Sequence, residues 1–229
     1  MNDLPTHIAI IPDGNRRWAD MNGLPRFEGH QAGAERMHQV VDRLIELDIK
    51  YLTVWGFSVD NWKRKDEEVQ GLLYLLQLWI EKDTPWLHEN GVRLRHIGHL
   101  YELPQGLQGA ISQAVALTDH NPGMTLNLAF NYTGRAEIVD AIRQLIADSV
   151  PENLVDEQLV SRYLYTNGMP DVDLVIRTAG ELRLSNFMLW QTAYSEYYFS
   201  NVFWPDFDKL ELEKALQAYQ ARDRRFGGD

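Results

Sequence analysis

One acidic and two basic side chains stand close together near the start of the chain. Asp13, Arg16 and Arg17 lie within the stretch HIAIIPDGNRRWA, residues 7–19. A carboxylate beside two guanidinium groups suits a diphosphate accompanied by a divalent metal ion. The stretch alone is equally typical of a charged surface turn, because junctions between strands and helices often carry polar residues.

Further clusters of polar residues follow two later apolar runs. The first comes after the run YLTVWGF and comprises Ser58, Val59, Asp60, Asn61, Trp62, Lys63 and Arg64. The second comes after the run DVDLVI and comprises Arg177, Arg183, Ser185 and Asn186. Two arginines and a hydroxyl group in one loop make a second candidate anion site, although arginines after strands are also common on protein surfaces.

Three more polar residues are candidates on local grounds. Residues 20–31 are rich in Gly, Asn and Pro, and this composition predicts a loop that carries Arg26 and His30. Glu196 is the single acid in the aromatic segment 187–203. A carboxylate in so apolar a setting needs a cationic or metal partner, which makes Glu196 a candidate metal ligand. Isolated histidines are more often structural than ligands, and this is the simpler interpretation of His7 and His30.

The spacing of apolar residues predicts strands that alternate with helices. Runs rich in β-branched residues predict strands at 8–11, 51–58, 92–97, 124–130 and 171–178. Helical spacing predicts a helix from about residue 16 and further helices near 37–45, 66–89, 106–119, 135–148, 156–164 and 208–222. This alternation favours right-handed crossovers, and therefore an α/β fold with a central, mostly parallel sheet flanked by helices.

Two of the predicted helices have features that bear on function. Helix 66–89 is apolar on more than one face. An interior position is the simpler explanation, and a helix with one face on the sheet and another on an apolar cavity is the alternative. The helix near 208–222 is followed by the segment 222–228, RDRRFGG, and a basic helix end followed by glycine predicts ordinary capping.

The three polar clusters at 13–30, 58–64 and 177–196 each follow a predicted parallel strand. Ligands of open α/β sheets bind at the carboxyl ends of the strands, so we expect the clusters to converge at one edge of the sheet. The sequence carries no Ser-His-Asp order, nucleophile elbow, G-x-G-x-x-G turn or Walker A motif. The pooled residues therefore favour electrophilic chemistry with a diphosphate leaving group, and dinucleotide binding is a weaker alternative.

Composition limits the classes of partner. The chain has 229 residues, no cysteine, and 22 basic against 33 acidic residues, which gives a net charge of −11. Nonspecific binding to nucleic acid or to an anionic membrane surface is therefore disfavoured. The absence of cysteine excludes disulfides and thiolate metal sites. With no signal peptide and no long apolar run in the sequence, we expect a cytoplasmic protein that forms one domain over residues 1–229.

With these residues assembled, the chain resembles the cis-prenyltransferase family, the undecaprenyl diphosphate synthase-like isoprenyl transferases, from about residue 7 onwards. The motifs that carry the resemblance are HIAIIPDGNRRWA, GHQAGAER, FSVDNWKR, IRTAGELRLSNFMLWQTAYSEYYF, WPDFD and RDRRFGG. The resemblance implies a homodimer of α/β subunits with an apolar tunnel. It also implies Mg²⁺-dependent condensation of isopentenyl diphosphate with an allylic diphosphate, farnesyl or geranylgeranyl diphosphate, to form Z double bonds, and transient membrane contact for product release.

The same resemblance assigns roles to individual residues. It makes Asp13 and Asn61 catalytic, with Asp13 and Glu196 on the metal ion. The residues implied to hold the allylic diphosphate are Gly14, Asn15, Arg16, Arg17, Trp18, Arg26 and His30. Those implied to position the substrates near Asn61 are Ser58, Val59, Asp60, Trp62 and Arg64. The isopentenyl diphosphate site would comprise Arg177, Arg183, Leu184 and Ser185, with Arg225 and Gly227 reaching a neighbouring subunit's site.

The chain also departs from the family pattern. Arg16 stands where many bacterial members have glycine, Ala179 replaces a glycine, and Leu182 sits where some members place a metal-side histidine. Product length would depend on tunnel depth, where Gly56 leaves room and Met124, Trp79 or Phe130 could close the far end, so it stays open. A noncatalytic partner subunit that binds polyprenyl diphosphates is the alternative function.

Overall fold

The computed structural model describes residues 4–222, and its centre is one six-stranded sheet. All neighbouring strands pair in parallel, which confirms the predicted fold class. From one edge to the other, the strands are β3 (Arg93–Ile97), β4 (Thr125–Tyr132), β2 (Tyr51–Ser58), β1 (His7–Ile11), β5 (Leu174–Arg177) and β6 (Glu196–Phe199). The continuous apolar runs of β1 and β5 suit strands that are covered on both faces, and both are buried along their whole length.

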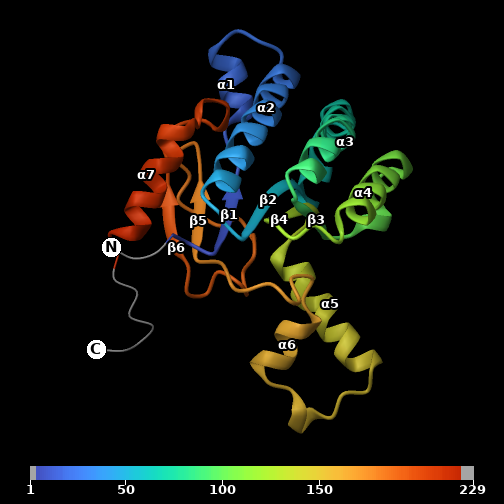
Figure 1. Ribbon diagram of the computed structural model, residues 1–229. Helices are drawn as coiled ribbons and strands as arrows, with labels where there is room; N and C mark the ends of the chain where they lie inside the picture. Colours follow the sequence, from blue (N-terminus) through green and yellow to red (C-terminus); the bar gives the residue numbers. More distant parts are fainter. Residues whose placement is uncertain (1–3, 223–229) are drawn as a thin grey trace.

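Helices and loops cover the two faces of the sheet (Figure 1). On one face lie α2 (Arg26–Glu46), α3 (Asp66–Glu89), α4 (Gln105–Thr118) and α7 (Lys209–Gln220). The remaining helices are α1 (Asn15–Met21), which packs on α2, and α5 (Gly134–Ala147) and α6 (Glu157–Tyr163), which extend away on the other side. Four 3₁₀ turns complete the described elements: η1 (Val59–Lys63), η2 (Leu100–Glu102), η3 (Glu152–Leu154) and η4 (Trp204–Asp206).

The alternation of side chains along β1 divides the core between the two faces. Ile8 and Ile10 join the larger cluster, which the helices α2, α3, α4 and α7 close. Ala9 and Ile11 point to the opposite face and join a smaller cluster that contains Phe187. Because successive residues of a strand face opposite sides, one short strand anchors both halves of the core and fixes the position of the turn that follows it.

The predicted loop at residues 20–31 is shorter than expected and spans only 22–25, because α1 ends at Met21 and α2 begins at Arg26. The residue before it, Pro25, has an extended backbone that ends the preceding turn. Gly29, which lay in the predicted loop, and Gly33, just after it, serve a close contact between helices instead. A Cβ on Gly29 would lie 2.2 Å from the main-chain oxygen of Asn15, and one on Gly33 would lie 2.6 Å from the side-chain Oδ1 of Asn15.

Two further boundaries differ from prediction. The strand predicted at 171–178 begins only at Leu174, since the Asp173 carboxylate turns away to accept hydrogen bonds from the N–H groups of Thr6 and His7. The edge strand β6 was not predicted, because its four residues are all partly exposed and show no alternation. The strand predicted at 51–58 and the helix predicted at 66–89 have the predicted bounds.

No helix within residues 4–222 is both long enough and apolar enough to cross a lipid bilayer.

Candidate active site

The order in which the chain adds strands to the sheet changes sides between β1 and β5, and the site lies at the carboxyl ends of these two strands. From β1 the chain moves to β2 on one side, and it later returns to place β5 on the other side. Asp13 follows β1, and Arg177 ends β5. The Arg177 Nη2 group donates a hydrogen bond of 2.7 Å to Asp13 Oδ2. Arg177 is almost fully buried whereas the Asp13 side chain is 31% exposed, so the carboxylate keeps access to a ligand.

Thr178 holds the main chain of Asp13 in place. Its hydroxyl accepts a hydrogen bond of 2.8 Å from the Asp13 N–H and donates one of 2.7 Å to the Asp13 carbonyl. The N–H of Trp204 donates to the same carbonyl at 3.0 Å. Thr178 was not among the predicted site residues, although its place directly after Arg177 at the end of a buried strand was an available signal.

Arg177 also orders the loop that follows β5. Its Nη1 group donates to Ser185 Oγ at 2.8 Å and to the carbonyl oxygen of Arg183. The loop requires left-handed backbone at Ala179 and Ser185, which explains why glycine is suitable where this chain has Ala179. Arg183 itself is exposed and forms an ion pair with Glu181. The structure thus brings Ser185 to Arg177 and leaves the Arg183 guanidinium at the rim.

Leu184 and Leu182 take different positions in the same loop. Leu184 is partly buried and packs against the smaller core cluster. Leu182 is 75% exposed, so it fills no pocket in the single chain. Leu184 therefore anchors the loop, whereas nothing in the structure explains the leucine at position 182.

Gly14 is the turn between β1 and α1. Its φ of +104° is left-handed, a conformation that side chains rarely adopt. A Cβ there would lie 2.7 Å from the Phe203 ring and 2.9 Å from the Ala179 side chain. Phe203 and Ala179 therefore leave room only for glycine at position 14. The left-handed turn at Gly14 sets the direction in which α1 leaves β1.

The side chains that follow this turn fix α1 against its neighbours. Arg17 contacts Asp13 at 3.5 Å and forms an ion pair of 3.1 Å with Glu181. Trp18 donates from Nε1 to Asp206 Oδ1 at 2.8 Å. Trp18 thus ties α1 to η4, which places it beside the site as an anchor of the helix.

Three arginines from different elements surround one carboxylate, Glu68. The Glu68 side chain on α3 lies 3.4 Å from Arg16, 3.8 Å from Arg26 and 3.1 Å from Arg64. These arginines belong to α1, α2 and the end of η1, so the predicted convergence of the first two polar clusters is observed. Glu68 was not among the predicted site residues, although its spacing of four residues after Arg64 was a usable signal.

His30 and Asn15 carry buried polar atoms at this mouth that lack a partner. Neither His30 Nε2 nor Asn15 Oδ1 has a hydrogen-bond partner within the structure. Burial, together with the charges of Arg64 and Arg16, lowers the pKa of His30 to about 4. The ring is therefore neutral at pH 7, and buried polar atoms without partners are suited to contact a ligand or water.

Ser58 and Asn61 form a reciprocal cap on η1. The N–H of Asp60 donates to Ser58 Oγ at 3.1 Å, and the N–H of Ser58 donates to Asn61 Oδ1 at 3.0 Å. The amide oxygen of Asn61 is thereby engaged, which leaves its NH₂ group as the free donor. This geometry favours Asn61 as an orienting donor and speaks against a role as a base.

The other residues of η1 form its outer side. Trp62 donates from Nε1 to Asn131 Oδ1 at 2.8 Å and meets the Phe57 ring edge-on. Asp60 is exposed and pairs with Lys63. Val59, between the cap residues, is half-buried. Trp62 therefore anchors the turn on β4, while Asp60 and Val59 border the opening.

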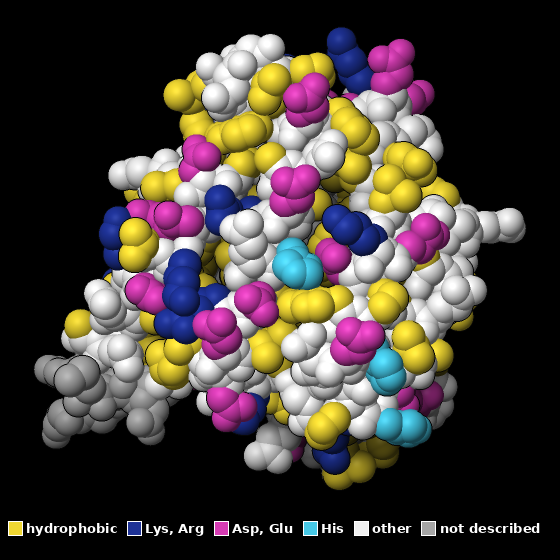
Figure 2. Space-filling view, turned by 45° about the horizontal axis from the view of Figure 1, so that its top comes forward, with side chains coloured by type: hydrophobic (Ala, Val, Ile, Leu, Met, Phe, Trp, Pro, Cys, Tyr) yellow, Lys and Arg dark blue, Asp and Glu magenta, His cyan; other side chains and the backbone are white. Residues whose placement is uncertain are grey.

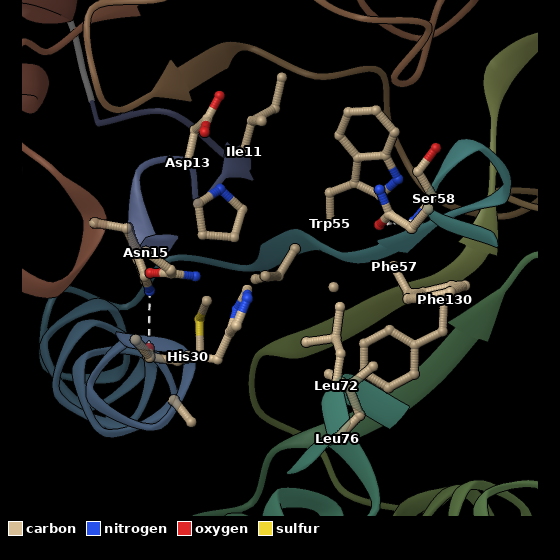
Figure 3. A pocket seen from close by; sticks show the side chains of 18 of the residues that line it. Ile11, Asp13, Asn15, His30, Trp55, Phe57, Ser58, Leu72, Leu76 and Phe130 are labelled. Carbon is tan, nitrogen blue, oxygen red and sulfur yellow. Dashed lines mark hydrogen bonds between the residues drawn. The ribbon is translucent and has the colours of Figure 1, made fainter. Parts of the chain in front are cut away.

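These groups surround the opening of a cavity of about 350 Å³. Figure 3 shows Asp13 and Ser58 at its polar side and Leu72, Leu76 and Phe130 together at its apolar side. Helix α3 contributes Leu72, Leu75, Leu76 and Trp79 to the lining, while Val69, Leu73, Ile80 and Leu87 join the core. The helix thus has one face on the core and one on the cavity, which corrects the simpler interpretation of a purely interior helix.

Glu196 lies at the opposite edge of the sheet from Asp13. It begins β6 and pairs with Leu174 at the amino end of β5, whereas Asp13 contacts Arg177 at the carboxyl end. Leu174 and Arg177 are three residues apart on β5, and each residue of a strand rises about 3.3 Å. The Glu196 carboxylate pairs with Arg222 at 2.8 Å. Within one chain, therefore, Asp13 and Glu196 lie too far apart to hold one metal ion together, and the metal role of Glu196 stays a prediction.

Three other residues considered in the sequence are not placed at the cavity by the described part of the chain. Arg225 and Gly227 lie outside the described residues 4–222. His7 is buried at the amino end of β1, between the Pro170 carbonyl and Thr53 Oγ1 at 2.8 Å each, so it is structural. Among the described residues, no group of three or more acidic, histidine or cysteine side chains is arranged to hold a metal ion.

Charges of both signs are mixed around this region. Figure 2, in which the top of the molecule comes forward, shows basic and acidic side chains next to one another on this face. On a chain of net charge −11, the arginines at the cavity mouth therefore bind an anion through local contacts rather than through a long-range positive field.

Comparison with known proteins identifies the family that this geometry fits. The family model described as "Putative undecaprenyl diphosphate synthase" matches residues 11–227. The chain belongs to this family. It is 47% identical to an isoprenyl transferase of Clostridium tetani over all of this chain and 91% of the relative, and 48% identical to one of Clostridium perfringens over 98% and 90%.

Solved structures of related enzymes share the fold. The lavandulyl diphosphate synthase of Lavandula x intermedia, solved in complex with dimethylallyl diphosphate, superposes with a TM-score of 0.95 at 38% identity. The match covers 98% of both chains. The protein is therefore an isoprenyl transferase of the undecaprenyl diphosphate synthase family.

Proposed function

We propose that this isoprenyl transferase condenses isopentenyl diphosphate with an allylic diphosphate, in the presence of Mg²⁺, to give a Z-polyprenyl diphosphate. The observation that carries the proposal is that two separate sets of arginines lie at the mouth of one cavity. Arg177 lies on one side of Asp13, and Arg16, Arg26 and Arg64 lie on the other, above an apolar cavity. Two diphosphates and one hydrocarbon chain need this combination of charge and apolar space.

The apolar cavity decides which diphosphate belongs to which arginine group. Leu72 and Leu76 of α3 lie behind the group formed by Arg16, Arg26 and Arg64. The allylic diphosphate carries the hydrocarbon chain, so we assign it to this group, together with the unpartnered atoms of His30 and Asn15. Isopentenyl diphosphate is short and is assigned to Arg177, Ser185 and the exposed Arg183.

Asp13 lies between the two arginine groups and fits a Mg²⁺ ion that diphosphate oxygens also bind. Magnesium prefers octahedral oxygen ligands and is usually held by one or two carboxylates plus substrate phosphates. The partly exposed Asp13 carboxylate fits this pattern. When bound, the ion neutralises charge on the diphosphates; Glu196 has no part in such a site within one chain.

The reaction breaks the C1–O bond of the allylic diphosphate and forms a carbon–carbon bond from C1 to C4 of isopentenyl diphosphate. A proton then leaves C2 of the isopentenyl unit. The arginines stabilise the departing diphosphate, and the Asn61 NH₂ group, held by Ser58, orients a substrate oxygen. Because the amide cannot accept a proton at neutral pH, we assign the proton to a diphosphate oxygen.

Incubation with labelled isopentenyl diphosphate tests this proposal. Dimethylallyl, geranyl, farnesyl and geranylgeranyl diphosphates would each be offered as primer, with Mg²⁺ or with EDTA. We expect a labelled lipid product with Mg²⁺ and none with EDTA. Full activity in EDTA would refute the metal assignment. No product from any primer would refute the proposed reaction and favour a noncatalytic partner subunit that binds polyprenyl diphosphates.

The proposed assembly is a homodimer in the cytoplasm. Helix α5 exposes Val139, Ile142 and Ile146 at a spacing that places them on one side. An apolar stripe of this kind on a projecting helix supports a subunit contact there. An Ile146→Asp variant should sediment as a smaller species than the wild type.

Exposed Tyr74 and Leu78 on α3 suit the proposed transient contact with a membrane during product release.

A further inference from the structure

One residue near the end of β4 has no partner on the neighbouring strand β2. Phe130 pairs with Phe57, and Tyr132 pairs with Ser58. Asn131 is thus an extra residue, a β-bulge, and its φ of +51° is left-handed, a conformation that asparagine tolerates better than most residues. Phe130 joins the larger core cluster and Tyr132 the smaller one, although residues two apart on a regular strand face the same side. The bulge therefore turns the end of β4 over and re-aims the Asn131 side chain.

The Asn131 side chain joins β4 to η1 and η2. It is 1% exposed. Its Oδ1 atom accepts a hydrogen bond of 2.8 Å from Nε1 of Trp62 on η1. Its Nδ2 group donates to the Glu102 carboxylate on η2 at 2.8 Å and to the His99 carbonyl oxygen at 3.2 Å. An indole N–H only donates, and carbonyl and carboxylate oxygens only accept, so these partners fix which way the amide faces.

The hydrogen bond to Asn131 ties η1 to the sheet. None of the five residues of η1 is buried, and a segment with few buried contacts opens easily. The edge-on contact of Trp62 with Phe57 is its aromatic packing. Within residues 4–222, the other side-chain hydrogen bonds of η1 stay inside the turn and its cap, from Lys63 to Asp60 and from the Ser58 N–H to Asn61. The bond between Trp62 and Asn131 therefore fixes where the turn lies.

Trp62 stands in the chain between two groups at the cavity mouth. Asn61 precedes it, and the N–H of Arg64 donates to the Asn61 carbonyl at 3.0 Å. Asn61 and Arg64 both line the cavity. Because the three residues belong to one short turn, a shift of the indole moves both of its neighbours.

We propose that Asn131 is a positioning residue for prenyl transfer: its amide, oriented by Glu102, holds Trp62 and thereby keeps the Asn61 NH₂ group and Arg64 at the cavity mouth. This inference rests on the proposed condensation reaction. Asn131 acts through η1 and not on a substrate. Since a misplacement of about 1 Å costs on the order of 10²-fold in rate, loss of this amide should be measurable in turnover.

Steady-state kinetics of Asn131→Gly tests the inference. Glycine keeps the left-handed backbone and removes the amide. We expect kcat to fall about 10–100-fold. The KM for the allylic primer should change much less, because Arg16 and Arg26 lie on α1 and α2 and do not depend on η1.

Asn121→Gly is the matched control for the loss of a buried amide. Asn121 is also buried, and its Nδ2 group donates to the Val92 carbonyl at 2.7 Å, before the amino end of β4. This variant should lower the midpoint of thermal unfolding and leave kcat unchanged. All rates would be measured at a temperature where each variant is folded.

A pair of charge variants separates the hydrogen bond from general damage. Asn131→Asp keeps the size and an acceptor for Trp62, but it places a second carboxylate against Glu102, so we expect a loss of kcat. The double variant Asn131→Asp/Glu102→Gln restores an N–H···O bond between the two positions with donor and acceptor exchanged. It should recover most of the kcat that Asn131→Asp loses.

The indole N–H resonance of Trp62 reports the bond independently of activity. Trp62→Phe identifies this resonance by its absence from a ¹H–¹⁵N spectrum. In Asn131→Gly the resonance should move toward the position of a solvent-exposed indole and exchange faster with water. In Asn121→Gly it should not move.

The outcomes distinguish this inference from the proposed function. An unchanged kcat in folded Asn131→Gly overturns the inference and leaves the proposed reaction intact. A reduced kcat with an unmoved Trp62 resonance also overturns it, because the loss would not pass through Trp62. If Asn131→Gly does not fold, a double variant no faster than Asn131→Asp overturns it instead. No product from any primer would refute the reaction itself, and the inference with it.

Discussion

Asp13 and Glu68 each lie among arginines at the cavity mouth, and each compensates charges that would otherwise repel one another. Asp13 contacts the almost fully buried Arg177, and Glu68 lies within 3.8 Å of three arginines. The two acids differ in what surrounds them: Asp13 lies between the two arginine groups, whereas Glu68 is enclosed by one of them. We therefore expect their substitutions to have opposite effects on diphosphate binding.

The variant Asp13→Asn tests the proposed metal site, because it removes the negative charge of the side chain and keeps its size nearly unchanged. We expect kcat/KM to fall by about 10²–10³, the usual effect of losing one electrostatic contact in the transition state. Arg177 keeps an amide oxygen as acceptor, so the variant should remain folded by circular dichroism. Asp48→Asn, at an exposed position, is the matched control. Normal turnover in Asp13→Asn would remove the basis of the metal assignment.

For Glu68, the variant Glu68→Gln removes a negative charge that competes with the substrate. At an effective dielectric constant of about 20, a charge about 5 Å away is worth roughly 3 kcal/mol, more than the roughly 0.5–1.5 kcal/mol needed to order an arginine side chain. We expect inorganic pyrophosphate to bind about tenfold more tightly in calorimetry, with a smaller gain at high salt. Glu67→Gln, exposed on the same helix turn, should bind as the wild type does. Weaker binding in Glu68→Gln would mean that Glu68 mainly orients the arginines.

At the scale of elements, the contact between α1 and α2 shows how glycine can mislead an interpretation of sequence. Gly29 belonged to the predicted loop at 20–31, but Gly29 and Gly33 both lie inside a 21-residue helix where Asn15 of α1 approaches closely. The close contact is a tertiary requirement that local composition does not reveal. By contrast, β2 and α3 have sharp changes of composition at both ends, which explains why their bounds were predicted correctly.

Gly29→Ala should disturb both stability and substrate binding. Its Cβ would lie 2.2 Å from the Asn15 main-chain oxygen, so α1 and α2 must move apart and carry Arg16 away from Arg26. We expect a lower midpoint of thermal unfolding and a raised KM for the allylic primer. Gly109→Ala lies on α4 with no atom within 4 Å of the new Cβ, so it should gain about 0.5–1 kcal/mol of stability from helix propensity. A neutral or stabilising Gly29→Ala would contradict the tight contact.

The candidate site was predictable wherever a residue follows its strand directly. Asp13, Ser58 and Arg177 come at strand ends, and the parallel sheet brings all three to one edge. The position of Glu196 at the amino end of β6 was not anticipated, because this partly exposed strand was not recognised in the sequence. Thr178 and Glu68 were missed because their partners are main-chain atoms and arginines on other elements, which sequence order does not connect.

At the scale of the whole molecule, buried histidines couple stability to pH. Burial lowers the pKa values of His7, His30 and His96 to about 4, from 6.5 for a histidine without such burial. Between these values the unfolded chain binds more protons, so the free energy of unfolding rises with pH. This stability is complete above about pH 6.5 and is lost as the pH falls toward 4, at up to about 1.4 kcal/mol per pH unit for each histidine.

Urea denaturation at pH 5 and pH 7.5 would measure this coupling. His7→Gln removes one titrating group at the sheet edge opposite Asp13, and it should reduce the difference in unfolding free energy between the two pH values. His120→Gln, whose side chain is 99% exposed, should leave that difference unchanged. An equal difference in the wild type and in His7→Gln would show that His7 does not contribute.

The pairing of β1 with β5 has a consequence for how the chain is synthesised. Asp13 and Arg177 are 164 positions apart in sequence, yet they meet across neighbouring strands. At about 5–20 residues per second, roughly 10 to 30 s of translation separate the appearance of the two strands. During that interval one edge of β1 has no partner and can pair with other chains. A ribosome-bound nascent chain that has not reached residue 177 therefore leaves this edge of β1 unpaired, and it lacks the contact between Arg177 and Asp13 until β5 emerges.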